Sequence, residues 1–271
     1  MIPALFQVGG FAVETHGLFV LLGVTAAVVV LAMEARRRRI RDPRLVWIAV
    51  GALFCGAVGA KLSTVWRYAL DADDPSLHGA LLYGGKSVLG GLAGAYVGVL
   101  LTKRIVGWTT STGDLFAPAV ALGMAIGRWG CFLTEQVGTP TSLPWGLAVS
   151  PEAAARIPHC PGCVAGVAMH PSFLYEIAFH AAMFGVLLWL RPRVSRAGDL
   201  FKIYLGCYAV FRFVVEFVRA NPVMWAGLSG SQLFLLPSLV LMAVYAGRRW
   251  AASRTGPDIS WEEAALCGRT S

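Results

Sequence analysis

Five ionisable side chains lie within stretches that are otherwise apolar and about as long as a membrane-crossing helix: Lys61, Arg128, Glu176, Arg212 and Glu216. An ionisable group at membrane depth is costly, so it normally faces a protein interior or a wet cavity and marks a functional site. The alternative is that each long side chain reaches the nearest headgroups by itself. Because cations and carboxylates share one depth, the sequence favours a common site.

The segment around Arg212 carries a polar stripe. Tyr208, Arg212 and Glu216 recur every four residues, which places a phenol, a guanidinium and a carboxylate on one helix face, and Arg219 adds a cation at the rim. The planar guanidinium of arginine binds two phosphate oxygens at once, and a phospholipid headgroup is the phosphate available at this depth. A structural ion pair between Arg212 and Glu216 is an alternative, and it is compatible with a catalytic role.

The longest loop between apolar segments, 134–171, ends at His170 before the helix start Pro171-Ser172. Alone, His170 fits an interfacial histidine as well as a catalytic one. Within the loop, Cys160 and Cys163 form a CxxC. A disulfide is favoured over zinc, because no second CxxC completes a tetrahedral site. We therefore predict no metal site and no cofactor.

Seven apolar segments are long enough to cross a bilayer core. They are 14–33, 45–66, 87–102, 114–133, 172–190, 199–218 and 231–247. The chain is 56% hydrophobic and only 14% charged, about half the charged content of a soluble domain. We predict an all-α polytopic membrane protein with the bilayer as a partner, a single domain over 1–250 and a cytoplasmic tail over 251–271. Asp114 and Asp199 follow a glycine at helix starts and are expected to be N-caps.

The formal charge of +8 is distributed unevenly over the loops and helix ends. Of the 23 basic residues, 16 fall on one predicted face of the membrane and four on the other. The positive-inside rule then places the N-terminus outside and the C-terminus in the cytoplasm. The charge orients the protein, and no nucleic-acid partner is expected. No basic residue precedes the first segment, so we expect no cleaved signal peptide.

Several segments, in order along the chain, resemble the prolipoprotein diacylglyceryl transferase family. The matching segments are Gly17-Leu18-Phe19, Gly59-Ala60-Lys61, the glycine-rich 84–94, Asp114 with Ala117-Pro118, Gly127-Arg128-Trp129-Gly130-Cys131-Phe132, Gly138, Pro144-Trp145-Gly146, His170 to Glu176, and Tyr208 to Arg219.

The resemblance implies a bacterial inner-membrane enzyme with seven spans. Its activity would move diacylglyceryl from phosphatidylglycerol to the lipobox cysteine thiol of a preprolipoprotein and release glycerol phosphate. Arg128 and Arg212 match the family's essential arginines, which would hold the lipid phosphate. Tyr208, Glu216, Gly138 and either Glu135 or Gln136 also fall on positions that the family uses. Lys61 and Glu176 are predicted to line the same lipid site.

Three positions depart from the family pattern. A histidine that is a candidate base in the glycine-rich segment is here Leu89, an asparagine is Cys131, and a first-span tyrosine is His16. A thiol benefits from a base or from cations that stabilise the thiolate. The base is therefore expected to be His16 or His170, unless Arg128 and Arg212 activate the thiol themselves.

Two alternatives to this transferase remain open. One is a transferase of the same fold with a different acceptor. The other is a catalytically inactive protein that binds phospholipid with the same arginines. A transporter is disfavoured, because the charges gather in one layer away from the midplane.

Overall fold

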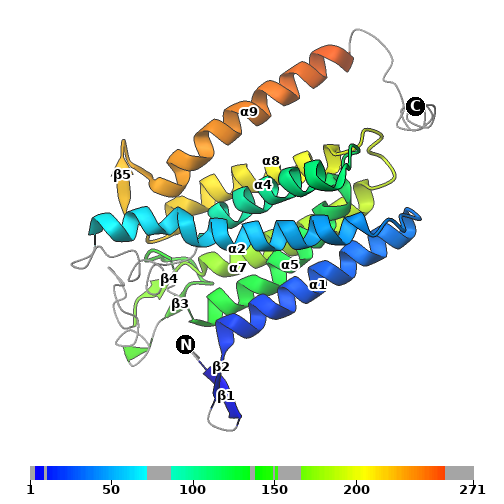
Figure 1. Cartoon of the computed structure of the whole chain (residues 1–271). Coiled ribbons are helices and arrows are strands. Elements are labelled where there is room, and N and C mark those ends of the chain that lie inside the picture. Colours follow the sequence, from blue (N-terminus) through cyan, green and yellow to red (C-terminus); the bar gives the residue numbers. More distant parts are fainter. Residues whose placement is uncertain are drawn as a thin grey trace, which may run out of the picture. The chain divides into compact units, whose positions relative to one another are not determined.

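The chain is predominantly helical in the computed structural model, which describes residues 4–8, 11–71, 87–134, 138–148, 150–151 and 166–253 (Figure 1). The described α-helices are α1 (Thr15–Arg37), α2 (Arg44–Asp71), α4 (Val88–Val106), α5 (Gly113–Thr134), α7 (Ser172–Leu190), α8 (Asp199–Val215) and α9 (Gly230–Ser253). A short 3₁₀ helix, η1 (Glu216–Val218), continues α8.

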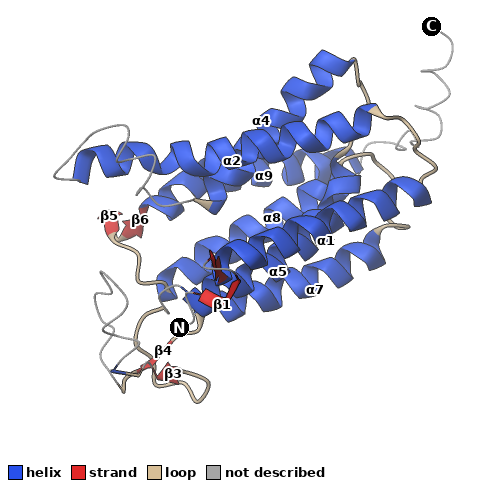
Figure 2. Cartoon of the chain, turned by 60° about the horizontal axis from the view of Figure 1, so that its bottom comes forward, coloured by secondary structure: helices blue, strands red, loops and turns tan. Residues whose placement is uncertain are grey.

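Within the described residues, three antiparallel strand pairs accompany the helices. They are β1 (Ala4–Val8) with β2 (Phe11–Glu14), β3 (Leu147–Ala148) with β4 (Ala168–Met169), and β5 (Val223–Trp225) with β6 (Leu228–Ser229). In Figures 1 and 2 these short strands lie toward one end of the helices to which they connect. The β5–β6 turn passes through Ala226 and Gly227, both with positive φ, as a two-residue hairpin loop requires.

Six described helices are long and apolar enough to cross a membrane: α1, α4, α5, α7, residues 44–63 of α2 and residues 230–248 of α9. These helices confirm the predicted class, an all-α polytopic membrane protein. The remaining predicted segment, 199–218, is divided between α8 and η1. At about 1.5 Å per residue, the 17 residues of α8 alone fall short of a ~30 Å bilayer core.

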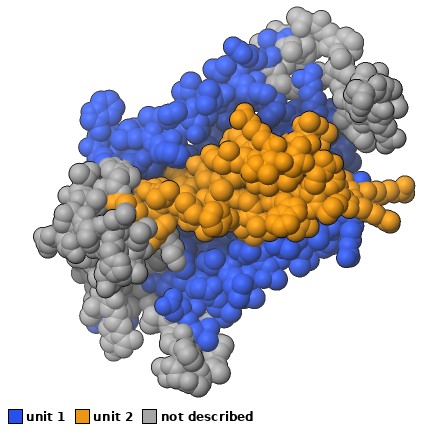
Figure 3. Space-filling model, in the orientation of Figure 1, with its two compact units in different colours: residues 1–38, 111–271 blue, residues 39–110 orange. Residues whose placement is uncertain are grey.

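The chain forms two compact units (Figure 3). Unit 1 comprises residues 1–38 and 111–271, and unit 2 comprises residues 39–110. The prediction of one domain over 1–250, with a tail from 251, stays a prediction.

Helix α5 is the centre of unit 1, where it packs against α1, α7 and α8. Small buried residues such as Ala117 and Ala121 allow these helices to approach closely. Gly23 of α1 and Gly123 of α5 approach closely, since a Cβ on Gly23 would lie 2.6 Å from the Gly123 carbonyl oxygen. The buried faces of α5, α7 and α8 meet in a cluster of Ala117, Ala121, Met183, Leu187, Leu200 and Tyr204.

Unit 2 contains the packed helix pair α2 and α4. Glycines line their contact: a Cβ on Gly94 would lie 2.3 Å from the Cys55 carbonyl oxygen, and one on Gly59 would lie 2.5 Å from the Gly90 carbonyl oxygen. The described end of the glycine-rich segment therefore serves close helix packing. Ser87 caps α4 by accepting a hydrogen bond from the Gly90 N–H at 3.2 Å.

The predicted N-caps at Asp114 and Asp199 are wrong in detail. The Asp114 carboxylate accepts hydrogen bonds from the N–H groups of Gly198 (2.8 Å) and Leu200 (3.0 Å), so it caps α8 and not its own helix. Asp199 pairs with Lys202 at 3.0 Å and accepts from the Tyr245 hydroxyl at 2.5 Å. A carboxylate at a helix start is free to satisfy N–H groups of a neighbouring helix that the sequence does not reveal.

Candidate active site

The site begins with a buried ion pair between two helices of unit 1. Arg128 lies in the last two turns of α5, and Glu176 lies in the second turn of α7. Their Nη2 and Oε2 atoms are 2.5 Å apart, and the side chains are 7% and 0% exposed. A pair so enclosed holds the guanidinium in a fixed position before any ligand arrives.

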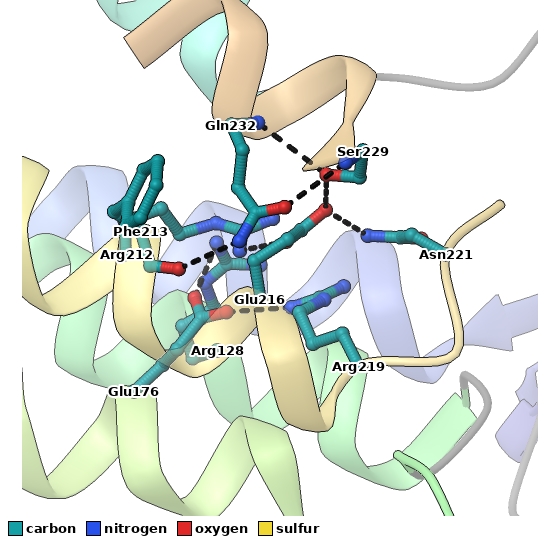
Figure 4. A network of polar contacts seen from close by, with 9 residues as sticks. All are labelled: Arg128, Glu176, Arg212, Phe213, Glu216, Arg219, Asn221, Ser229 and Gln232. Atoms are coloured by element: carbon teal, nitrogen blue, oxygen red, sulfur yellow. Dashed lines mark hydrogen bonds and ion pairs between the residues drawn. The ribbon is translucent and has the colours of Figure 1, made fainter. Parts of the chain in front are cut away.

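A second pair, Arg212 with Glu216, forms at the end of α8. The second oxygen of Glu216, Oε1, accepts hydrogen bonds from Asn221 Nδ2 at 2.8 Å and from Ser229 Oγ at 2.6 Å (Figure 4). Asn221 precedes β5 and Ser229 is the last residue of β6, so both ends of the β5–β6 hairpin are tied to this carboxylate.

Arg219 connects the two pairs, because its side chain binds Glu176 and its backbone N–H donates to the Glu216 carbonyl at 3.1 Å. Its Nη1 atom donates to Glu176 Oε1 at 2.5 Å, and its guanidinium lies 4.5 Å from the centre of the Phe173 ring. The Arg128 guanidinium lies 5.8 Å from the same ring. The cation predicted at the rim is therefore part of the site, where it shares Glu176 with Arg128 (Figure 4).

The formal charge of this network is set by three arginines and two glutamates. Arg128, Arg212 and Arg219 carry three positive charges against the two negative charges of Glu176 and Glu216. The excess of one positive charge suits a monoanion such as a phosphodiester. Arginine forks are the usual ligands of such a group, and the burial strengthens the attraction.

Tyr208 lies one helical turn before Arg212, and its side chain is buried at 2% exposure. Its hydroxyl lies against the Arg128 side chain, and its O–H donates to no acceptor within the described ranges. The predicted stripe of Tyr208, Arg212 and Glu216 is thus found on the buried side of α8 and η1.

Gly138 and His170 meet in the loop beside η1. The Gly138 N–H donates to the His170 carbonyl at 2.7 Å, and a Cβ on Gly138 would lie 2.1 Å from the Val218 carbonyl oxygen. Only glycine, which has no Cβ, allows the two backbone segments to approach this closely. The His170 ring lies 3.1 Å from the Tyr175 hydroxyl through Nδ1, and the Trp145 indole donates to that hydroxyl at 2.9 Å.

His16 approaches the arginines through Cys131. The Cys131 sulfur lies 3.8 Å from Arg128 Nη1 and 3.9 Å from His16 Nδ1. Of the two predicted bases, His16 is thus linked to Arg128 through a single side chain, whereas the His170 ring contacts Tyr175.

The structure does not test the remaining predicted site residues. Glu135, Gln136, Cys160 and Cys163 fall outside the described residues, so the lipid contact and the disulfide stay predictions. Lys61 belongs to α2 of unit 2 and also stays a prediction as a lipid ligand.

The structure adds three polar residues that the sequence reading missed. Ser229 and Gln232 cap α9 reciprocally: the Ser229 N–H donates to Gln232 Oε1 at 2.9 Å, and the Gln232 N–H donates to Ser229 Oγ at 3.3 Å. This is a capping box, which the sequence pattern Ser-x-x-Gln predicts. No such signal marks Asn221, which reaches Glu216 across a turn.

The sequence profile of the prolipoprotein diacylglyceryl transferase family matches residues 3–247. Among curated proteins, the phosphatidylglycerol–prolipoprotein diacylglyceryl transferase of Gloeobacter violaceus is 33% identical, over 93% of this chain and 94% of its own length. The transferases of the same name from Nostoc and Clostridium tetani are 30% and 28% identical, over 94% and 82% of this chain and 91% and 87% of their own lengths. With its buried arginine–glutamate network and this match over nearly its whole length, the chain belongs to the prolipoprotein diacylglyceryl transferase family.

Proposed function

We propose that this protein is a phosphatidylglycerol–prolipoprotein diacylglyceryl transferase of the bacterial inner membrane. It would transfer diacylglyceryl from phosphatidylglycerol to the lipobox cysteine thiol of a preprolipoprotein. The observation that carries the proposal is the buried network of three arginines and two glutamates, with its excess of one positive charge, in a chain of this family.

The lipid phosphate binds by replacing carboxylates on the arginines. Glu176 and Glu216 hold Arg128 and Arg212 charged and in place while the site is empty, which avoids leaving a buried cation unpaired. When the phosphate arrives, its oxygens take positions that the glutamate oxygens occupied. Each arginine exchanges one ion pair for another. Because the arginines are already buried, binding the phosphate does not require them to be desolvated again.

The reaction forms a carbon–sulfur bond. The acceptor thiolate attacks the glyceryl carbon that bears the phosphate ester, the carbon–oxygen bond breaks, and its electron pair leaves with the phosphate oxygen as glycerol phosphate. Arg128 and Arg212 stabilise the charge that develops on the leaving group, the role of fixed donors aimed at a transition state. The thiol proton passes to a base.

His16 and His170 are the candidates for this base, and the approach of His16 to Arg128 through Cys131 favours His16. We expect His16→Gln to lower the transfer rate most at low pH, where the thiol itself is protonated. His170→Gln is the matched comparison. Unchanged pH–rate profiles for both single variants and for the double variant would contradict a histidine base, leaving activation by the arginines.

The decisive assay combines purified protein, labelled phosphatidylglycerol and a lipobox peptide, and it scores both the thioether product and the released glycerol phosphate. Arg128→Ala is expected to lower kcat/KM by roughly 100-fold or more, because a donor to the leaving group is lost. Arg128→Lys should recover part of the rate only, since an ammonium cannot bind two oxygens in the arginine geometry.

Arg212→Ala leaves Glu216 without its cation and can unfold the helix end. The paired change of Arg212→Met with Glu216→Leu removes both charges and should give a folded, inactive protein. Arg193→Gln is the matched control, because Arg193 stacks on Trp189 outside the network. Wild-type transfer by folded Arg128→Ala would contradict the proposal. Lipid binding without turnover by the wild type would favour the inactive lipid-binding alternative.

A further inference from the structure

His180 is a fully buried histidine on α7 that the proposed reaction does not use. Its Nδ1 atom lies 3.0 Å from the Tyr204 hydroxyl, and Tyr204 is itself 0% exposed. If Tyr204 donates its proton to Nδ1, both groups are satisfied. The opposite arrangement would leave the tyrosine O–H without an acceptor. The histidine is therefore neutral with its proton on Nε2.

The Nε2–H group of His180 makes no hydrogen bond in the part of the chain that the structure describes. The Tyr208 O–H and Arg128 Nε also have no acceptor there, although the Arg128 side chain lies against the Tyr208 oxygen. The His180 and Tyr208 rings have their centres 4.9 Å apart, and the charge of Arg128 acts on both residues. Three buried donors without acceptors thus lie on neighbouring side chains, and the carboxylate of the cluster, Glu176, is held in its ion pair with Arg128 Nη2.

Such an arrangement is costly if nothing ever binds there. A buried donor without an acceptor destabilises a fold, and a phenylalanine at either aromatic position would avoid that cost. Because all three groups donate, the ligand that satisfies them is an acceptor oxygen. A neutral imidazole and a phenol suit an uncharged carbonyl, while the charged arginine ends face the glutamates.

The place of these donors identifies the oxygen. Tyr208 and His180 each stand one turn, about 6 Å along the helix axis, further into the helices than Arg212 and Glu176. This is the side on which a phospholipid bound by its phosphate carries its acyl chains. Its ester carbonyls lie a few bonds beyond the phosphate, across the glycerol backbone.

We propose that His180 Nε2–H and the Tyr208 hydroxyl, assisted by Arg128, bind an ester carbonyl oxygen of the donor phospholipid. The subsite rests on the proposed function, since it orients the same lipid whose phosphate the arginines hold. The donor atoms are enclosed by the protein. The carbonyl reaches them when the phosphate displaces Glu176 from Arg128, so both contacts form in one rearrangement.

The experiment compares diacyl phosphatidylglycerol with its dialkyl ether analogue of equal chain length, which keeps the phosphate and lacks both carbonyls. Transfer to a lipobox peptide and lipid binding to the purified protein, measured by native mass spectrometry, are both recorded. The wild type should prefer the ester lipid by about tenfold in kcat/KM and in binding, the effect of one or two hydrogen bonds. His180→Phe should abolish this preference, so that the ester and ether lipids are used and bound equally.

A matched pair of amides separates the subsite from a structural role. The glutamine amide nitrogen occupies the place of Nε2, and the asparagine amide nitrogen occupies that of Nδ1. His180→Gln should therefore keep the ester preference, and His180→Asn should lose it. Tyr208→Phe should lower the preference as well. If His180 served only its contact with Tyr204, the variants would lose activity toward both lipids equally.

The outcomes separate the two proposals. Equal use of ester and ether lipids by the wild type overturns the subsite while leaving the transferase standing. An ester preference in binding, without any transfer, supports the subsite and overturns the transferase. A preference that His180→Phe and Tyr208→Phe leave at tenfold overturns the assignment to these residues.

Discussion

Glu216 shows at the level of one residue how the site is held ready for a ligand. One carboxylate oxygen pairs with Arg212, while the other accepts from Asn221 and Ser229. If a phosphate takes over Arg212, the second oxygen keeps both neutral donors. Glu216 therefore has a stable position whether or not the lipid is bound. Glu176, shared between Arg128 and Arg219, retains a partner in the same way.

Gly138 provides a residue-scale prediction outside the helices. Gly138→Ala should destabilise the protein by about 1–3 kcal/mol, because the new methyl group would overlap the Val218 carbonyl and force the loop apart. The shift also disturbs η1, which carries Glu216, so transfer activity should fall. Thermal unfolding in detergent and the transfer assay measure the two effects.

Gly185→Ala is the matched control for this change. A Cβ at Gly185 in α7 meets nothing within 4 Å, so the free energy of unfolding should change by less than about 1 kcal/mol. Equal unfolding temperatures for the two variants would show that the loop around Gly138 yields to a methyl group. The steric explanation for this glycine would then be wrong.

At the scale of the elements, the site depends on where α8 ends. The helix stops at Val215, and the chain tightens into η1 before the β5–β6 hairpin. Asn221 and Ser229 fasten both sides of that hairpin to Glu216, and Ser229 also caps the start of α9. The end of one helix, a hairpin and the start of the next helix are thus held by a single carboxylate.

The sequence predicted the elements better than their connections. Apolar length alone located the helices, and the four-residue spacing put Tyr208, Arg212 and Glu216 on one face, as the structure has them. Composition also favoured buried positions for Arg128 and Glu176, because an ionisable group among apolar residues is costly unless it faces the protein interior.

Contacts between distant segments were beyond such reasoning. Asp114 satisfies N–H groups of a helix that begins 85 residues later, and nothing in its own surroundings reveals that partner. His180 follows Glu176 by one turn, but its role depends on Tyr204 and Tyr208 of α8. Period and composition describe one helix at a time, whereas these contacts follow from the packing of two.

At the scale of the whole molecule, basic residues of the loops and the arginine–glutamate network lie at opposite ends of the unit 1 helices. Arg191, just after α7, pairs with Glu34 in the last turns of α1, so these two helix ends lie together. Asp114, at the start of α5, accepts hydrogen bonds from the N–H groups of Gly198 and Leu200 at the start of α8, so these two helix starts also lie together. The arginine–glutamate network occupies the end of α5, the start of α7 and the end of α8.

This separation leads to a prediction about orientation. Because 16 of the 23 basic residues fall on one predicted face, we expect the C-terminus in the cytoplasm and the site toward the outside. Green fluorescent protein fused to the C-terminus should fluoresce, while alkaline phosphatase at the same position should be inactive. Fusions to a chain truncated after Gly227, in the hairpin between α8 and α9, should give the reverse result. Immunoblots of the membrane fraction control for the amount of each fusion. Phosphatase activity at the C-terminus would place the site on the cytoplasmic side, where a preprolipoprotein thiol exposed at the outer face could not reach it.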